Sequence, residues 1–286
     1  MKPVFFKIAW RVLLYPAILC AAVSFVFCWL YIHPRRYTGD AVPEDFGLRP
    51  ETLELKTADG VRLAAWFIPN KNSKKAVILC HGYPMDKSDI LGLTSFLGKE
   101  FNLLYFDFRA TGRSGGFFST GGSREVRDID AAVKFLEERG FKGGIGIFGF
   151  SMGGATALLS RNPSLKARAL DAPYATLAGE LDYIFRSRGS LRKPLLALMK
   201  AWTFVLTGVN IDAVNPIKNA GAFASPLLLV HGDADAQVTA ENSLAIKAAD
   251  PRAELWVIKG AGHGENRGLA GPDYERRLTA FFKKNL

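Results

Sequence analysis

The chain has 286 residues, of which 49% are hydrophobic, and it carries a formal net charge of +10 at pH 7. This length and apolar content suit one large globular domain with a short additional segment. Lys and Arg are spread along the chain without a run of five or six, and neither zinc-finger spacing nor a basic-aromatic RNA-binding signature is present. We therefore expect no nucleic-acid partner. We interpret the positive charge as serving attraction to an anionic membrane surface.

The N-terminal segment has the composition of a membrane anchor. Residues 12–32 form a run of 21 uncharged and mostly apolar positions, which as a helix is about 31 Å long, close to the thickness of a bilayer core. Basic residues flank this run: Lys2, Lys7 and Arg11 precede it, and Arg35 and Arg36 follow it. We predict a single-pass anchor over residues 1–32 and, from the prolines and charges that follow, a linker over residues 33–50.

Two other interpretations of this segment stay open. A cleaved signal peptide needs small residues before its cut site, which Ala21 and Ala22 offer only poorly, and the apolar run continues past them. A buried core helix is the second alternative. Three basic residues before the run against two after it slightly favour a cytoplasmic N-terminus, which places the rest of the chain on the non-cytoplasmic side of the membrane.

The cysteines indicate no special chemistry. Cys20 and Cys28 fall in the apolar N-terminal run, and Cys80 ends a strand-like run. Their spacing matches neither a disulfide framework nor a metal site, so we expect inert thiols. Cysteine usage therefore does not indicate the cellular compartment.

Beyond residue 50, short apolar runs alternate with longer amphipathic stretches such as residues 123–139 and 240–249. The strand-like runs are residues 63–68, 76–80, 103–107, 145–148, 167–170, 227–230 and 255–258. This alternation predicts an α/β fold over residues 51–286, with a mostly parallel sheet covered by helices on both faces.

One segment, residues 172–225, interrupts this rhythm. It is far longer than an ordinary connection between two strands, and it mixes aromatic and aliphatic residues with several arginines and lysines. Long insertions with helical content often cover a site, so we expect a helical lid. Extra helices packed on the sheet are the alternative.

Two pentapeptides match the pattern Gly-x-Ser-x-Gly, which in a tight strand-to-helix turn presents a nucleophilic serine. They are Gly-Arg-Ser-Gly-Gly around Ser114 and Gly-Phe-Ser-Met-Gly around Ser151. Ser151 follows a strand-like run and precedes a helix-like run, which is the required context. Ser114 is followed by further glycines, which is typical of a loop. We therefore predict Ser151 as the nucleophile.

A serine hydroxyl needs a base to take its proton and an acid to orient that base. In folds with this turn the order along the chain is nucleophile, acid, base, so of the four histidines only His231 and His263 can serve. With His231 as the base, the candidate acids are Asp171, Asp182 and Asp212. With His263 as the base, the acid lies within residues 231–238. We favour His263, which stands in a glycine-rich loop after the last strand.

These motifs resemble the α/β-hydrolase superfamily. They are most similar to the membrane-anchored or secreted single-domain hydrolases that include ABHD-type lipases and thioesterases and their bacterial relatives. The resemblance covers about residues 50–286, and residues 172–225 match poorly. It implies a Ser-His-Asp triad that acts without a metal ion or an organic cofactor.

The resemblance also implies the remaining site residues. The family's acid follows a strand as His-Gly-x-x-Asp-x-x-Val, which here gives Asp235, with Asp233 of the same loop as the rival. The family's oxyanion donors correspond to the backbone N–H groups of Tyr83 and Met152. Residues 107–114 resemble a segment with a structural role, although Ala110 replaces a common glycine there.

The resulting hypothesis is a serine hydrolase of carboxylic esters or thioesters with lipophilic acyl chains, held at the membrane by its N-terminal helix. A peptidase or an acyltransferase would use the same residues. Enzymes of this fold with an aspartate nucleophile are disfavoured by Ser151. A catalytically idle, membrane-tethered binding module is the alternative from another class. The sequence does not indicate the oligomeric state.

Overall fold

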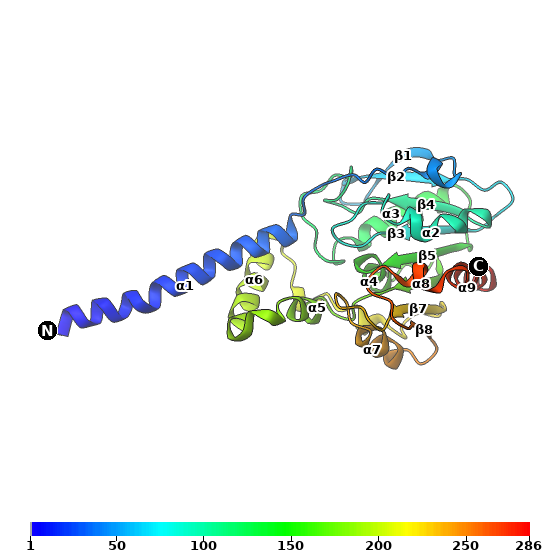
Figure 1. Cartoon of the computed structure of the whole chain (residues 1–286). Helices are drawn as coiled ribbons and strands as arrows, with labels where there is room; N and C mark the ends of the chain where they lie inside the picture. Colours follow the sequence, from blue (N-terminus) through cyan, green and yellow to red (C-terminus); the bar gives the residue numbers. More distant parts are fainter. Residues whose placement is uncertain (1) are drawn as a thin grey trace.

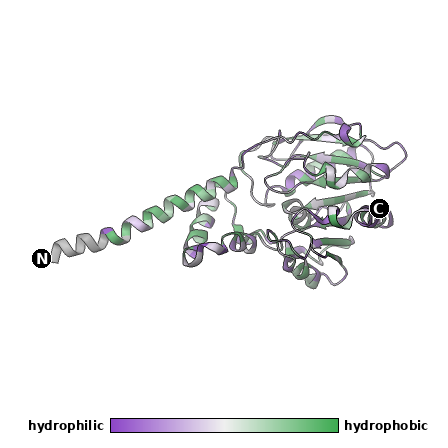
Figure 2. Ribbon diagram, viewed as in Figure 1, coloured by the Kyte–Doolittle hydropathy of each residue, from purple (hydrophilic) through white to green (hydrophobic). Residues whose placement is uncertain are grey.

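The N-terminal helix stands apart from a globular α/β domain in the computed structural model, which describes residues 2–286, with side chains for residues 11–12 and 14–286 (Figure 1). Helix α1 (Lys2–Ile32) extends away from the domain, and its described part is largely hydrophobic (Figure 2). Its segment Leu14–Ile32 is long and apolar enough to cross a membrane, a property shared by signal sequences at this position and by some core helices.

The domain is built on one eight-stranded sheet in the order β1-β2-β4-β3-β5-β6-β7-β8. The strands are β1 (Glu51–Lys56), β2 (Arg62–Ile68), β3 (Ala76–Cys80), β4 (Asn102–Phe106), β5 (Ile145–Phe150), β6 (Leu165–Asp171), β7 (Leu227–Gly232) and β8 (Glu254–Ile258). Strand β2 pairs antiparallel with both β1 and β4, and all other pairs are parallel. The carboxyl ends of the parallel strands therefore meet at one edge, where ligands bind in open α/β sheets.

Helices cover both faces of the sheet, because each buried strand presents apolar side chains on both sides. On β3, Ala76, Ile78 and Cys80 belong to one core cluster, while Val77 and Leu79 belong to the other. The first cluster includes residues of α3 (Val126–Glu138), α4 (Met152–Leu159) and α7 (Glu241–Ala249). The second includes residues of α2 (Leu91–Thr94), η2 (Ser95–Lys99) and α9 (Pro272–Asn285), and α8 (Asn266–Ala270) adjoins α9.

The predicted α/β fold is confirmed, with a mostly parallel sheet between two layers of helices. Each of the seven strand-like runs coincides with a strand to within about two residues at either end. The sequence analysis missed β1, because most of its residues are exposed at the sheet edge and its apolar content is low. An edge strand with charged residues gives little hydrophobic signal.

The insertion, residues 172–225, is largely helical and packs against the end of α1. It holds α5 (Leu177–Ile184), η3 (Arg186–Leu191), α6 (Arg192–Thr207), η4 (Ile211–Ala213) and η5 (Pro216–Asn219). A third apolar cluster joins this insertion to α1 through Cys28, Ile32, Leu181, Phe185, Leu195, Leu196, Met199 and Ile211. Residues 33–50, which contain η1 (Pro43–Phe46), connect α1 to the sheet. The division into anchor, linker and catalytic domain stays a prediction.

Candidate active site

Ser151 stands on a strained turn between β5 and α4. Its backbone has φ 51° and ψ −117°, a conformation that is costly for a residue with a side chain and that is found at functional sites. The backbone N–H of Ser151 donates to the carbonyl oxygen of Asp171 at 2.8 Å, which ties the turn to the end of β6. The turn places the serine at the carboxyl edge of the sheet, as its strand-turn-helix sequence context predicts.

The two glycines of this turn are required by close backbone contacts. A Cβ atom on Gly149 would lie 2.5 Å from the carbonyl carbon of Gly153, and one on Gly153 would lie 2.3 Å from the carbonyl oxygen of Cys80. Because neither neighbour is a flexible side chain, any larger residue would displace backbone. These contacts explain why the turn needs glycine two positions before and two positions after Ser151.

His263 and Asp235 meet on neighbouring loops that follow β8 and β7. The Nδ1 atom of His263 lies 2.7 Å from Oδ2 of Asp235, whose side chain is 1% exposed. The other carboxylate oxygen accepts the backbone N–H groups of Gln237 and Val238, each at 2.9 Å. Burial alone would raise the pKa of Asp235, but the nearby imidazoles of His231, at 3.6 Å, and His263 outweigh burial and hold it below its usual range. Asp235 is thus an anion fixed in one orientation beside the imidazole.

The rival residues Asp233 and His231 have other hydrogen-bond partners. Asp233 accepts the backbone N–H of Gly260 at 2.6 Å. His231 is fully buried, with Nδ1 2.7 Å from the Ser243 hydroxyl and Nε2 2.7 Å from the Val238 carbonyl oxygen. Both of its ring nitrogens are therefore engaged in packing the β7 loop.

The three other candidate acids serve structural contacts. Asp171 is buried and accepts hydrogen bonds from the Asn266 amide at 2.7 Å and from the Tyr274 hydroxyl at 2.6 Å. Asp182 pairs with Arg192 and Asp212 with Lys200 within the insertion. Asp171 thus positions α8 and α9, which follow the loop that carries His263.

Ser151 and His263 line one cavity of about 690 Å³, together with Tyr83 and Met152. Met152 is the first residue of α4, so its backbone N–H lies at a helix N-terminus, where four such donors lack intrahelical partners. The loop before Tyr83 is held by His81, whose Nε2 accepts the N–H of Phe108 at 3.0 Å and whose Nδ1 therefore donates to the Gly82 carbonyl oxygen at 2.6 Å.

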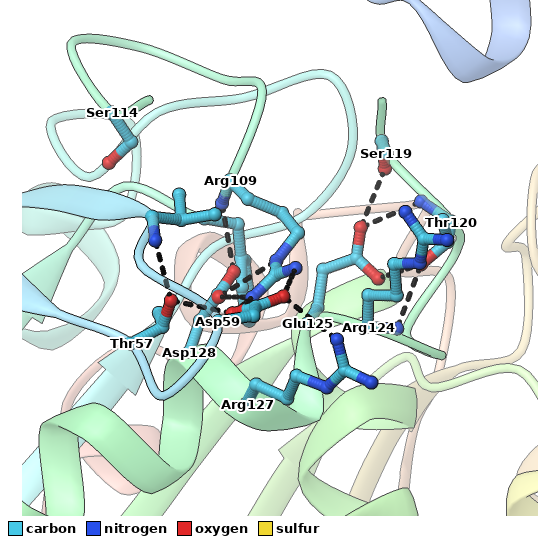
Figure 3. A network of polar contacts seen from close by, with 12 residues as sticks. Thr57, Asp59, Arg109, Ser114, Ser119, Thr120, Arg124, Glu125, Arg127 and Asp128 are labelled. Carbon is cyan, nitrogen blue, oxygen red and sulfur yellow. Dashed lines mark hydrogen bonds and ion pairs between the residues drawn. The ribbon is translucent and has the colours of Figure 1, made fainter. Parts of the chain in front are cut away.

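One wall of the cavity is held by a buried carboxylate (Figure 3). Glu125 accepts hydrogen bonds from the backbone N–H and the hydroxyl of Thr120, at 2.7 and 2.6 Å, and from the Ser119 hydroxyl at 3.1 Å. Ser119, Thr120 and Gly121 all line the cavity. Because Glu125 is fully buried, these bonds fix the wall without contact to solvent.

A second buried network lies beside it and involves residues 107–114 (Figure 3). The Arg109 guanidinium donates to Asp59 at 2.8 Å and to Asp128 at 2.7 Å. The Ser114 hydroxyl, 1% exposed, donates to the Asp107 carbonyl oxygen at 2.6 Å and accepts the Ala64 N–H at 3.0 Å. The second Gly-x-Ser-x-Gly match is therefore part of the scaffold, and Ala110 adopts the positive φ of 62° that glycine favours.

Sequence reasoning missed one acidic residue of the cavity, Glu180 on α5. It is 8% exposed and lines the cavity with His263. Burial raises the pKa of Glu180 to about 7, and the nearby His263 offsets part of that rise. A single glutamate in an amphipathic helix carries no functional signal in the sequence, since only the fold brings α5 over the serine.

We expect Glu180→Gln to remove a pH dependence of stability. The folded state binds this proton more tightly than the unfolded chain, where the pKa is 4.5, so the wild-type stability falls as pH rises from about 4.5 to 7. At about 1.4 kcal/mol per pKa unit, the variant should be more stable than the wild type by up to about 3 kcal/mol at pH 8, and by little at pH 4. Urea unfolding in detergent at both pH values measures this, and an equal difference at both would contradict it.

Among residues 2–286, no group of three or more His, Cys, Asp and Glu side chains is placed to hold a metal ion. Ser151 and His263 meet at the cavity, and the buried carboxylate of Asp235 lies against His263, an arrangement suited to acid–base and nucleophilic chemistry.

Comparison with known proteins identifies the family to which this fold belongs. YfhR of Escherichia coli K12 is 28% identical over 95% of both chains, and human alpha/beta hydrolase domain-containing protein 17B is 27% identical over 82% of this chain and 76% of its own. The solved structure of a Pyrococcus furiosus esterase is similar, with a TM-score of 0.73 and 29% identity over 89% of this chain and 98% of its own. A model of the alpha/beta hydrolase family matches residues 77–270. The chain belongs to the α/β-hydrolase family.

Proposed function

We propose that this protein is a serine hydrolase that cleaves carboxylic esters or thioesters. Ser151 attacks the substrate carbonyl while His263 takes its proton, and the backbone N–H groups of Tyr83 and Met152 hold the oxyanion. His263 then protonates the leaving alcohol or thiol, which leaves an acyl group on Ser151. A water molecule, deprotonated by His263, attacks that acyl group, and the carboxylic acid and the free serine are released.

The observation that carries this proposal is the meeting of Ser151 and His263 at one cavity, with Asp235 bonded to the far side of the His263 ring. Ser151 stands on its strained turn, His263 lines the same cavity, and Asp235 holds Nδ1 of His263 at 2.7 Å. A carboxylate at Nδ1 keeps the proton on that nitrogen, so Nε2 is free to accept the serine proton. The strain at φ 51° is unfavourable for folding and is consistent with a functional requirement for this turn.

The lining of the cavity supports a lipophilic acyl group. Most of its side chains are apolar, and they include Ile32, Met85, Leu177, Leu181, Ile184, Met199 and Ile211. Five of these seven belong to the insertion, which therefore acts as the lid that its length predicts. An esterase among the solved neighbours, at 29% identity, also favours ester hydrolysis.

We also propose that α1 anchors the enzyme to a membrane. Between Val12 and Leu30, large apolar side chains of α1 are exposed, which is unfavourable in water and favourable in lipid. Ser24, Cys28 and Ile32 are buried against the insertion, which supports the retention of at least residues 24–32 with the domain. The basic charge of the protein adds attraction to anionic lipid.

The experiment that tests the function is labelling with a fluorophosphonate probe, followed by peptide mapping, on the full chain in detergent. We expect one adduct, on the peptide that contains Ser151, and hydrolysis of 4-nitrophenyl esters by the same preparation. A folded sample that is neither labelled nor active on esters would contradict the proposal and would favour a binding module.

A further inference from the structure

The last three turns of α1 pack directly on the insertion through a narrow stripe. Ser24, Cys28 and Ile32 are spaced by four residues and are 0%, 1% and 6% exposed, so they lie on one helix face. Val26 and Leu30, on other faces of the same turns, are 54% and 58% exposed. This part of α1 therefore has one protein-facing side and one side open to the surroundings.

Specific contacts join this stripe to α6. The indole Nε1 of Trp202 donates to the Ser24 hydroxyl at 3.1 Å, and the Cys28 sulfur lies 3.3 Å from the Thr203 hydroxyl. Small side chains at positions 24 and 28 allow the two helices to approach closely. The packing is thus built from matched polar and small groups and fixes α1 against α6.

The C-terminal end of α1 is bonded to the catalytic machinery on two sides. The last carbonyl groups of a helix lack intrahelical donors. Here the Tyr31 carbonyl oxygen accepts the hydroxyl of Tyr83 at 2.8 Å, and the Ile32 carbonyl oxygen accepts the N–H of Ser119 at 2.8 Å. Tyr83 provides a proposed oxyanion N–H, and Ser119 lies in the wall held by Glu125. These two bonds fix the end of α1 relative to the loop that carries Tyr83 and relative to the cavity wall.

Three residues of this end face the reaction cavity itself. Cys28, Tyr31 and Ile32 line the same cavity as Ser151 and His263. Tyr31 adjoins Tyr83, Ile32 adjoins Ser119 of the cavity wall, and Cys28 lies one helical turn before Ile32, about 6 Å along the axis. Met199 and Thr203 of α6 also line the cavity, and the Thr203 hydroxyl lies 3.3 Å from the Cys28 sulfur. The cavity therefore extends from Tyr83 along the end of α1 as far as its contact with α6 at Cys28 and Thr203.

We propose that Cys28, Tyr31 and Ile32 of α1 determine acyl-chain specificity, with the chain of a long-chain ester or thioester lying along this end of α1 and ending at the α1–α6 contact beside Cys28. This inference rests on the proposed hydrolase function and deepens it. Short acyl groups end near Tyr31 and Ile32, whereas longer chains reach Cys28. The membrane helix is then a component of the substrate site in addition to a tether.

The test is a graded series at position 28, made in the full chain in one detergent. We compare the ratio of kcat/KM for 4-nitrophenyl dodecanoate to that for 4-nitrophenyl butanoate in wild type, Cys28→Leu and Cys28→Trp. The ratio should fall with side-chain volume, by about 3-fold for leucine and about 10-fold or more for tryptophan, because lost contacts of a few methylene groups have effects of this size. The matched control is Val26→Trp, which adds the same group to the exposed side of the same helix and should leave the ratio unchanged.

Fluorophosphonate labelling of each variant separates the inference from the function on which it rests. A wild type that is labelled and hydrolyses esters, with the same ratio in Cys28→Leu, Cys28→Trp and Val26→Trp, would overturn the role of α1 and leave the hydrolase proposal standing. A wild type that is neither labelled nor active would overturn both. If Cys28→Trp fails to fold, the leucine variant still decides, since its side chain is far smaller than tryptophan.

Discussion

Replacing Ser151 with alanine is expected to lower kcat/KM for ester hydrolysis by about 10⁴-fold or more and to abolish fluorophosphonate labelling. The acyl-enzyme forms on the serine oxygen, so its loss removes the covalent route and leaves only the rate that oxyanion and substrate binding provide. The strained backbone at position 151 is set by Gly149, Gly153 and the bond to Asp171. The variant should therefore fold, which thermal unfolding in detergent checks.

The matched control is Ser114→Ala, which changes the serine of the other Gly-x-Ser-x-Gly pentapeptide. Its hydroxyl is buried and bonds to the backbone of Asp107 and Ala64. Loss of the hydroxyl leaves one buried N–H without its acceptor, which destabilises by about 1–3 kcal/mol, while labelling at Ser151 should persist. Full labelling of Ser151→Ala, or loss of labelling only in Ser114→Ala, would contradict the assignment of the nucleophile.

Much of the fold could be predicted because local patterns and global architecture agree. The strand-like runs are continuous apolar segments, as strands buried on both faces require, and β3 is buried at all five positions. The turn at Ser151 was recognisable because its glycines, strand and helix are neighbours in sequence. β1 was missed because it is a mostly exposed edge strand. It is held by antiparallel pairing with β2, which in turn pairs with β4.

The parts of the cavity that the sequence did not predict come from tertiary packing. Glu180 and the stripe on α1 reach Ser151 only because the insertion folds back over the carboxyl edge of the sheet and contacts both. Cys28 looks like any small apolar residue of a membrane helix, and its role depends on where α6 lies. The four-residue spacing of Ser24, Cys28 and Ile32 was visible, but the residues that contact Ser24 and Cys28, Trp202 and Thr203, are 178 and 175 positions away in the sequence.

The choice between Asp235 and Asp233 likewise combines what the sequence predicts with what only the folded structure determines. The two residues are two positions apart in one loop, and both precede His263. The resemblance to the family favoured Asp235, and the structure brings its carboxylate to Nδ1 of His263, whereas Asp233 caps the N–H of Gly260. The Asp235 side chain is oriented by backbone hydrogen bonds from Gln237 and Val238, which no sequence pattern reveals.

Asp235→Asn should lower kcat by about 10³–10⁴-fold. The amide oxygen can still accept the backbone N–H groups of Gln237 and Val238, so its NH₂ group then faces Nδ1 of His263. Nδ1 must become the acceptor, which moves the ring proton to Nε2 and leaves no lone pair there for the Ser151 proton. The isosteric control, Asp233→Asn, keeps its acceptor for Gly260 and should retain kcat within about twofold. Steady-state kinetics on both variants decide between the two acids, because a large loss in Asp233→Asn with an active Asp235→Asn would assign the triad acid to Asp233.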